Sequence, residues 1–231
     1  GQADLLVLMV VDTVTGKITA IPISRDLMVD INVYSKNGQY LGTSNKQICL
    51  SYAYGDGMHT SCENTVKSVS RLFYGLSINS YIAFDISTIK DLNDAIGGVT
   101  IIAENDIRLY DKLIKKGESA TLKGAYALKY IRGRDQTSIE ANNERMLRQK
   151  NYMSAFFKQV LHNTKKDITT PLKLYDRVSE KIVTNLNVAD ISFLTKCIIQ
   201  NGSKISLDYL SINGKVKEEN GFAEFHHNKD E

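Results

Sequence analysis

The chain has 231 residues with 42% hydrophobic side chains and two prolines, which is enough to bury a substantial core as one domain and excludes a disordered chain. Its formal net charge of +3 is too small for a general nucleic-acid surface, so an anion site must be built by local clustering. The longest apolar run, residues 5–11, is far shorter than the ~20 residues of a membrane helix and is typical of a buried strand.

The chain is predicted to begin with a β-hairpin. The apolar runs LLVLMVV and ITAIPI flank a Thr-Gly turn, and their composition indicates that both strands are central. LMVDINVY is expected to be extended. Residues 35–47 are polar and rich in Gly and Asn, so we expect them to form a surface excursion.

A helix is predicted to follow the Gly-Asp-Gly break at 55–57. Thr60 and Glu63 have the spacing of a capping box, with Thr60 as the N-cap. Gly75 is the expected stop. Apolar residues follow the cap at helical spacing: Val66, Val69 and Phe73.

Strands and helices alternate further along the chain. SYIAFDI and VTIIAE are predicted strands on either side of a short helix, STIKDLNDAI, with Ser87 as its cap. Residues 115–119 mark a turn, and a short helix is expected from Thr121 into IRGR. LKLYDRVSEKIVTNL and NVADISFLTKCIIQN are predicted helices, ISLDYLSI a late strand and GFAEFHHNKDE an extended tail.

A long amphipathic helix is predicted from about Asn142. Its core face is expected to consist of four residues that lie close together on a helical wheel: Met146, Met153, Phe157 and Val160. Arg145, Arg148 and Tyr152 share an adjacent flank, because residues three and four apart are neighbours on a helix surface.

Arginines gather at one point of the sequence. The chain has eight, and four of them fall within 17 residues: Arg132, Arg134, Arg145 and Arg148. In an extended segment Arg132 and Arg134 would point the same way, as would Arg145 and Arg148 on the helix. Four converging positive charges are unfavourable without an anion of high charge density, and guanidinium groups match phosphate oxygens through paired hydrogen bonds. The pattern predicts a diphosphate ligand.

A carboxylate close to such a cluster suggests a divalent cation that bridges the phosphates, and Asp4 is the candidate. The chain has neither a GxxxxGK[ST] loop nor a GxSxG elbow, which argues against a P-loop nucleotide site and a serine hydrolase. Cys49, Cys62 and Cys197 are widely spaced and are expected to be unpaired small hydrophobes.

Six segments in register resemble the LytR-CpsA-Psr family of bacterial cell-wall enzymes. They are ADLLVLMVVD; TGK with ITAIPISRD; QICLSYAYGDG with SCENTV; LNDAIGGV; KGESATLKGAYALKYIRGR; and NNERMLRQ.

The resemblance implies a fold, a location and an activity. The fold is a three-layer α/β/α domain over residues 1–231, with a central mixed β-sheet and a hydrophobic channel for a polyprenyl tail. Members are anchored by an N-terminal membrane helix upstream of this chain and act outside the cytoplasmic membrane of mainly Gram-positive bacteria. They are magnesium-dependent phosphotransferases that move teichoic acid or capsular polysaccharide from an undecaprenyl-diphosphate carrier to peptidoglycan, and polyprenyl-diphosphate hydrolysis is a related reaction.

The resemblance also implies roles for single residues. Asp4 is similar to the family's metal-binding acid. Arg25 matches the arginine of a PRD segment, and with the R-x-R pair Arg132 and Arg134 it is expected to be catalytic. The diphosphate-binding set is expected to comprise Arg25, Arg132, Arg134, Arg145, Arg148 and Gln149.

This chain departs from the family pattern at several positions. Ser24 stands for the usual Pro, Leu27 for the usual Thr and Asn142 for a frequent Asp, for which Glu140 or Glu144 could substitute. The family's first strand, which resembles LLLGxD and whose Asp also serves the metal, is expected to lie upstream of this chain.

Two alternatives belong to other functional classes. One is a non-catalytic module that binds lipid-linked wall glycans or regulates the cell envelope. The other is a nucleic-acid-binding regulator, which fits poorly because no recognition helix or aromatic platform accompanies the arginines. We therefore expect no nucleic-acid partner.

Overall fold

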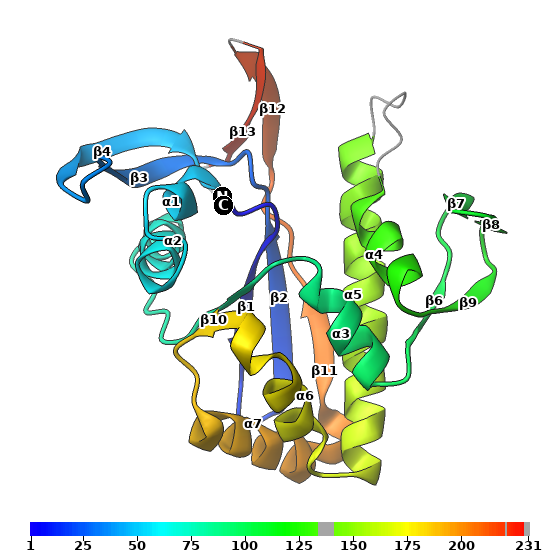
Figure 1. Ribbon diagram of the computed structural model, residues 1–231. Coiled ribbons are helices and arrows are strands. Elements are labelled where there is room, and N and C mark those ends of the chain that lie inside the picture. Colours follow the sequence, from blue (N-terminus) through cyan, green and yellow to red (C-terminus); the bar gives the residue numbers. More distant parts are fainter. Residues whose placement is uncertain (134–140, 220, 229–231) are drawn as a thin grey trace. The chain divides into compact units, whose positions relative to one another are not determined.

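The computed structural model describes the backbone of residues 1–133, 141–219 and 221–228. The chain is a mixed α/β protein, which confirms the predicted fold class (Figure 1). It divides into two compact units. The first unit comprises Gly1–Ala83, Val183–Asn187 and Asn201–Glu231, and the second comprises Phe84–Ile182 and Val188–Gln200. The single domain predicted over residues 1–231 stays a prediction.

The first unit contains a three-stranded mixed sheet. Its strands are β1 (Leu6–Val11), β2 (Lys17–Ile23) and β11 (Ser206–Tyr209), in the order β1-β2-β11. β1 pairs with β2 antiparallel, as predicted, and β11 pairs with β2 parallel. β1 stands at the end of this sheet and is not central as predicted, because β2 alone pairs with it among the described strands.

A second hairpin in the first unit corrects the sequence interpretation. β3 (Met28–Tyr34) pairs antiparallel with β4 (Tyr40–Gln47), so most of the expected surface excursion at 35–47 is a strand. Pattern analysis did not predict β4 as a strand because most of its side chains are polar. They bond across the hairpin instead, as between Asn45 Nδ2 and Asp30 Oδ1 at 3.1 Å.

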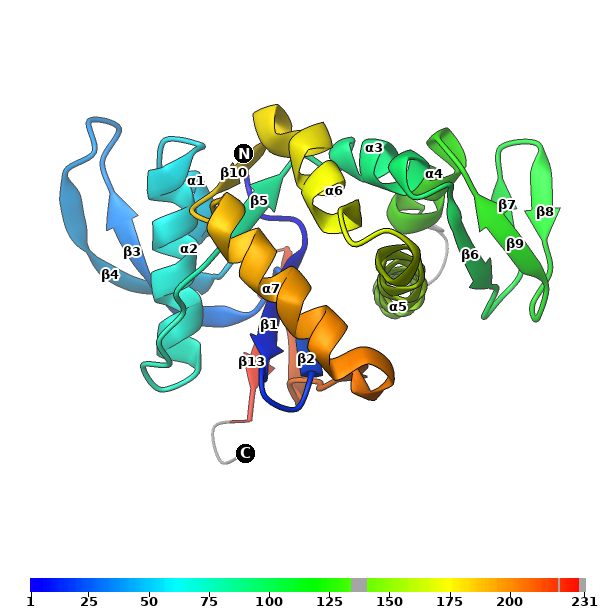
Figure 2. The same ribbon diagram turned by 90° about the horizontal axis from the view of Figure 1, so that it is seen from below.

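Two helices follow β4. α1 (Leu50–Ala53) is a single turn, and α2 (His59–Leu72) runs beside the β3–β4 hairpin (Figure 2). The predicted cap is wrong: α2 begins at His59, and Asp56 Oδ1 accepts from the backbone N–H groups of Met58 and Ser61 at 2.7 and 3.2 Å. Asp56, which precedes the helix, thus accepts hydrogen bonds from backbone N–H groups at its N-terminus, as the residues of a capping box would.

Part of the expected extended tail is one strand of a hairpin. β12 (Gly214–Glu219) pairs antiparallel with β13 (Phe222–His227), and Phe225 lies against the core of the first unit. This core consists of buried residues from β2, β3, α2 and the connections between them: Ile23, Leu27, Val29, Ile31, Ile48 and Val69.

The second unit is built from helices and two small antiparallel strand pairs. The helices are α3 (Thr88–Ala95), α4 (Ala125–Arg132), α5 (Ala141–Lys166), α6 (Thr170–Val178) and most of α7 (Val188–Asn201). β6 (Val99–Ile102) pairs with β9 (Ser119–Leu122), and β7 (Ile107–Leu109) with β8 (Lys112–Ile114). β5 (Ile82–Phe84) pairs with β10 (Ile182–Thr184) where the chain passes between units.

The buried face of α5 is centred on Tyr152, and Met146, which was predicted to lie on it, is exposed. Tyr152 is 6% exposed, whereas Met146 is 44% exposed. The Tyr152 hydroxyl donates to Asn93 Oδ1 at 2.8 Å, and Asn93 Nδ2 donates to the Leu122 carbonyl at 3.0 Å. Both bonds are buried, so they fix α5 against α3 and β9.

Two helix boundaries differ from the prediction. Residues 119–122 form β9, so α4 begins at Ala125 rather than at Thr121. α6 ends at Val178, and the following Ile182–Thr184 is the strand β10. Cys49, Cys62 and Cys197 are buried, as expected. Among the described residues, no helix combines the length and hydropathy of a membrane span.

Candidate functional site

Arg25 lies in the tight connection between β2 and β3, and its backbone is fixed from two sides. Its carbonyl accepts from the Cys49 N–H at 3.2 Å, and the carbonyl of Asp26 accepts from the Phe225 N–H at 2.8 Å. The next residue, Leu27, is fully buried, and its carbonyl accepts from the Ile48 N–H at 2.8 Å. The segment is thus held by the start of α1 and by β13.

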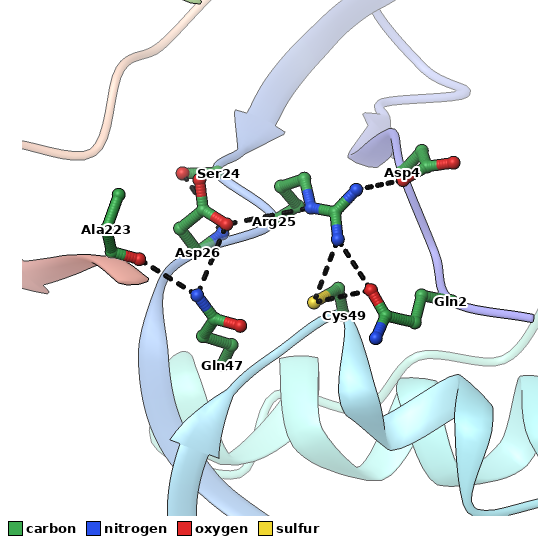
Figure 3. A network of polar contacts seen from close by, with 8 residues as sticks. All are labelled: Gln2, Asp4, Ser24, Arg25, Asp26, Gln47, Cys49 and Ala223. Carbon is green, nitrogen blue, oxygen red and sulfur yellow. Dashed lines mark hydrogen bonds and ion pairs between the residues drawn. The ribbon is translucent and has the colours of Figure 1, made fainter. Parts of the chain in front are cut away.

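The Arg25 side chain lies between groups that are far apart in the sequence (Figure 3). Nη1 forms an ion pair with Asp4, and Nη2 donates to Gln2 Oε1 at 2.6 Å. Nε lies 3.6 Å from Asp26 Oδ1. The side chain of Arg25 is 26% exposed, so its direction is set before any ligand binds.

Cys49 contacts the same guanidinium nitrogen as Gln2. Its Sγ lies 3.8 Å from Arg25 Nη2, and the residue is fully buried. Burial raises the pKa of the Cys49 thiol, and the positive charge of Arg25 opposes this effect without cancelling it. The thiol therefore stays neutral and adds no charge to the Arg25 cluster, by which we mean Gln2, Asp4, Arg25, Asp26 and Cys49.

The Arg25 cluster has one guanidinium and two carboxylates, which gives a formal charge of −1. An anion would meet net repulsion there unless a cation were also present. Asp4 offers a carboxylate that is 76% exposed, the oxygen donor that magnesium prefers. Across the described part of the chain, no three His, Cys, Asp or Glu side chains gather closely enough to hold a metal ion by themselves.

A second line of support connects Asp26 to the C-terminal hairpin. Gln47 Nε2 donates to Asp26 Oδ1 at 3.4 Å and to the Ala223 carbonyl at 2.8 Å (Figure 3). Gln47 thereby joins the last position of β4 to β13 and to the acid beside Arg25.

Arg132 is the last residue of α4, and its side chain is exposed. The prediction that Arg132 begins an extended segment is therefore wrong. It lies near Asp85, whose pKa is lowered first by a hydrogen bond from Ser87 and further by the charge of Arg132. Arg134, its predicted partner, lies outside the described residues, as does Glu140.

Arg148 and Gln149 contact the end of α4. Arg148 Nη2 donates to the Gly133 carbonyl, and Gln149 Nε2 donates to the Ile131 carbonyl at 3.5 Å. Carbonyls at the end of a helix lack partners within it and favour a positive charge nearby. Arg145 lies one turn before Arg148 on α5 and is partly buried. Part of the arginine cluster thus joins α4 to α5, and its role toward a diphosphate stays a prediction.

Sequence reasoning missed several residues of the Arg25 cluster. Gln2 and Cys49 are 23 and 24 residues from Arg25 along the chain, and Gln47 bonds to a residue 176 positions away. No local pattern marks such contacts. Asp26 was visible only as the neighbour of Arg25 in ISRD.

Solved structures resemble this chain in fold, and known relatives resemble it in sequence. A crystal structure of Bacillus subtilis TagV has a TM-score of 0.77 and 24% identity, with 100% of this chain and 85% of that chain covered. A structure of TagT bound to LIIa-WTA has a TM-score of 0.75 and 21% identity, with 99% and 80% covered. The polyisoprenyl-teichoic acid–peptidoglycan teichoic acid transferase TagU of Enterococcus faecalis is 26% identical over 223 residues. These residues are 95% of this chain and 63% of that relative.

The fold places this molecule in the same class of mixed α/β proteins as these solved structures. The family model LytR_cpsA_psr matches residues 1–231. The chain belongs to the LytR-CpsA-Psr family.

Proposed function

We propose that this chain transfers a cell-wall glycopolymer, of the teichoic acid or capsular class, from a polyprenyl-diphosphate carrier to a hydroxyl of peptidoglycan. One observation carries the proposal: the Arg25 guanidinium is oriented by Asp4, Gln2 and Asp26 in a chain of this family. The transferase name of the Enterococcus relative and the lipid-linked ligand of TagT support the substrate class.

The reaction is a displacement at phosphorus. The acceptor oxygen forms a bond to the sugar-proximal phosphorus, the bridging P–O bond breaks, and polyprenyl phosphate leaves with the electron pair. The hydroxyl proton passes to solvent. Such chemistry depends on positioning and on neutralising phosphoryl charge. Arg25 supplies guanidinium donors for this in the first unit, and Arg132 has an exposed guanidinium in the second. With water as the acceptor, the same displacement hydrolyses the carrier.

Magnesium fits the charge of the Arg25 cluster. Asp4 would hold it through its exposed carboxylate, and a bound divalent ion supplies neutralisation of the diphosphate. One such ion changes the formal charge of the cluster from −1 to +1. The net repulsion of a diphosphate then becomes attraction, while Arg25 keeps its orientation through Gln2 and Asp26.

The proposed location and lipid partner follow from the substrate. A lipid-linked donor and a peptidoglycan acceptor meet at the outer face of the cytoplasmic membrane, so we place the chain there, held by a membrane helix outside the sequence. Met9 and Val11 lie on one face of β1 and are 43% and 40% exposed, which offers apolar surface to a polyprenyl tail.

Release of polyprenyl phosphate tests the proposal. Arg25→Ala and Arg132→Ala should each lower turnover about 100-fold or more, the effect of removing one preorganised donor. Arg177→Ala removes an exposed arginine of α6 outside the site and should leave the rate unchanged. A divalent-metal chelator should stop product release by the parent protein.

Two outcomes would contradict the transferase assignment. Wild-type turnover in both arginine variants would remove these residues from the chemistry. Retention of lipid-linked glycan without any product, with or without magnesium, would indicate a binding module instead.

A further inference from the structure

The turn between β7 and β8 carries an exposed tyrosine in an unfavourable backbone conformation. Tyr110 is the first of the two residues that connect these strands, and its φ is 54°. This position in a short hairpin usually holds Gly, Asn or Asp, because a side chain in the left-handed region is sterically strained. Burial does not offset this cost, since Tyr110 is 57% exposed.

The base of this hairpin is rigid. Leu109, directly before the turn, is 1% exposed, and Ile114, the last residue of β8, is fully buried; both belong to the core of the second unit. The turn is therefore held in a fixed place on this unit, beside α4 (Figure 1).

The Tyr110 ring is oriented by two residues of α4. Tyr126 meets it edge to face, with the ring centroids 5.6 Å apart and the planes at 88°. The Lys129 ammonium lies over the Tyr110 ring, 5.9 Å from its centroid. Tyr126 is itself fixed, because its hydroxyl donates to Asp111 Oδ1 at 2.7 Å. The Tyr110 ring is thus exposed and fixed in orientation, and the Asp111 carboxylate and the Lys129 ammonium lie beside it.

We propose that Tyr110, Asp111, Tyr126 and Lys129 form a sugar-binding subsite for the lipid-linked glycan. The C–H face of a pyranose packs on the electron-rich face of an aromatic ring. Asp111 accepts hydrogen bonds from sugar hydroxyls, and Lys129 donates to them. The charges of these two residues cancel, which favours a neutral hydroxylated ligand over a strongly charged one.

The position of the subsite on α4 identifies which sugar it takes. Tyr126, Lys129 and Arg132 succeed one another at intervals of three residues, so they are neighbours along one side of the helix. Lys129 precedes Arg132 by about 4.5 Å of helix rise, and Tyr126 by about 9 Å. This inference rests on the proposed function, in which Arg132 binds the diphosphate. A sugar bonded to that diphosphate then extends along α4 toward the Tyr110 ring.

Tyr110→Gly is the decisive variant, because glycine removes the ring and also relieves the left-handed backbone. Its thermal stability should equal or exceed that of the parent. Tyr74→Gly is a matched control: Tyr74 also has a φ of 54°, is 86% exposed and lies in the first unit. Tyr110→Phe should behave like the parent, since the ring face makes the contact.

Binding is measured with two magnesium-loaded probes, a short-chain prenyl diphosphate and the same compound carrying an N-acetylhexosamine disaccharide. Tyr110→Gly should raise Kd about tenfold for the glycosylated probe, the size of one aromatic stacking contact, and leave the bare probe unchanged. Tyr74→Gly should change neither value, and Arg132→Ala should weaken both. Equal affinities of the parent and Tyr110→Gly for the glycosylated probe would overturn the subsite.

A third probe separates failure of the subsite from failure of the proposed function. Saturation transfer from the protein to the free disaccharide, which has no phosphate, should occur in the parent and in Tyr74→Gly and be lost in Tyr110→Gly. If the prenyl diphosphates do not bind, the proposed function fails and the disaccharide still decides on the subsite. Saturation transfer that persists in Tyr110→Gly would place the sugar elsewhere.

Discussion

The substitution Gln47→Ala should lower kcat, although Gln47 is not proposed to contact the substrate. Gln47 Nε2 donates to Asp26 Oδ1 at 3.4 Å and to the Ala223 carbonyl at 2.8 Å, and Asp26 in turn lies against Arg25 Nε. The substitution leaves Asp26 and Arg25 in place but removes the bond that fixes Asp26 to the C-terminal hairpin. Gln47 is therefore a positioning residue for Arg25.

The magnitude follows from these contacts. The bond to Ala223 has good length and is worth about 1 kcal/mol of folding free energy, and the longer bond to Asp26 is worth less. For a chain of this size, 1 kcal/mol lowers Tm by about 2–4 °C. The catalytic loss must stay below the ~3 kcal/mol expected for removing one donor entirely. We expect a fivefold to tenfold fall in kcat, about 1 kcal/mol in the barrier.

Asn45→Ala provides the matched control. Asn45 is also an amide of β4 and donates to a carboxylate, Asp30 Oδ1, at 3.1 Å, but Asp30 lies outside the Arg25 cluster. Release of polyprenyl phosphate and thermal unfolding should be measured for both variants. If the two variants lost similar stability and Gln47→Ala kept the parent's kcat, Gln47 would not be a positioning residue for Arg25.

Two further predictions concern the second unit and the helix α2. Tyr152→Phe leaves the fully buried Asn93 Oδ1 without its donor, and urea unfolding should show a loss of about 1–3 kcal/mol; an unchanged midpoint would mean that another donor replaces the hydroxyl. Burial raises the pKa of the Cys62 thiol to about 11, so the unfolded chain releases this proton first as pH rises. Stability should therefore fall between pH 9 and about 11, and Cys62→Ala should reduce this slope in equilibrium unfolding.

Local sequence patterns, apolar periodicity above all, predicted the elements whose signal lies within their own residues. The β1–β2 hairpin, the α5 helix and the turn at 115–119 all carry strong local signals. β4 was missed because its residues are polar and bond across to β3 instead of entering a core. The predicted core face of α5 included the exposed Met146 as well as Val160, which does pack against the core, and it left out Tyr152. A helical wheel cannot show that Asn93 supplies an acceptor for Tyr152.

The candidate site was predicted in part for the same reason. Arginine is conspicuous in the sequence, so Arg25 and Arg132 could be named from composition and family resemblance. Gln2 and Cys49 could not, since their contacts with Arg25 arise only when the N-terminal segment lies against α1. The backbone bond from the Ala3 N–H to the Cys49 carbonyl, at 3.3 Å, shows how that segment is attached.

The arginines near α4 can serve two purposes: hydrogen bonds to the end of α4, and positive charge for the proposed diphosphate. A guanidinium has five N–H donors in a plane, and Arg148 gives one of them to the Gly133 carbonyl. The bonds from Arg148 and Gln149 fix the end of α4, and Arg132 is the residue at that end. Loss of Arg148 would then displace Arg132 as well as remove a charge. A lysine at 148 would keep the charge but lose the planar geometry, so it separates positioning from electrostatic attraction.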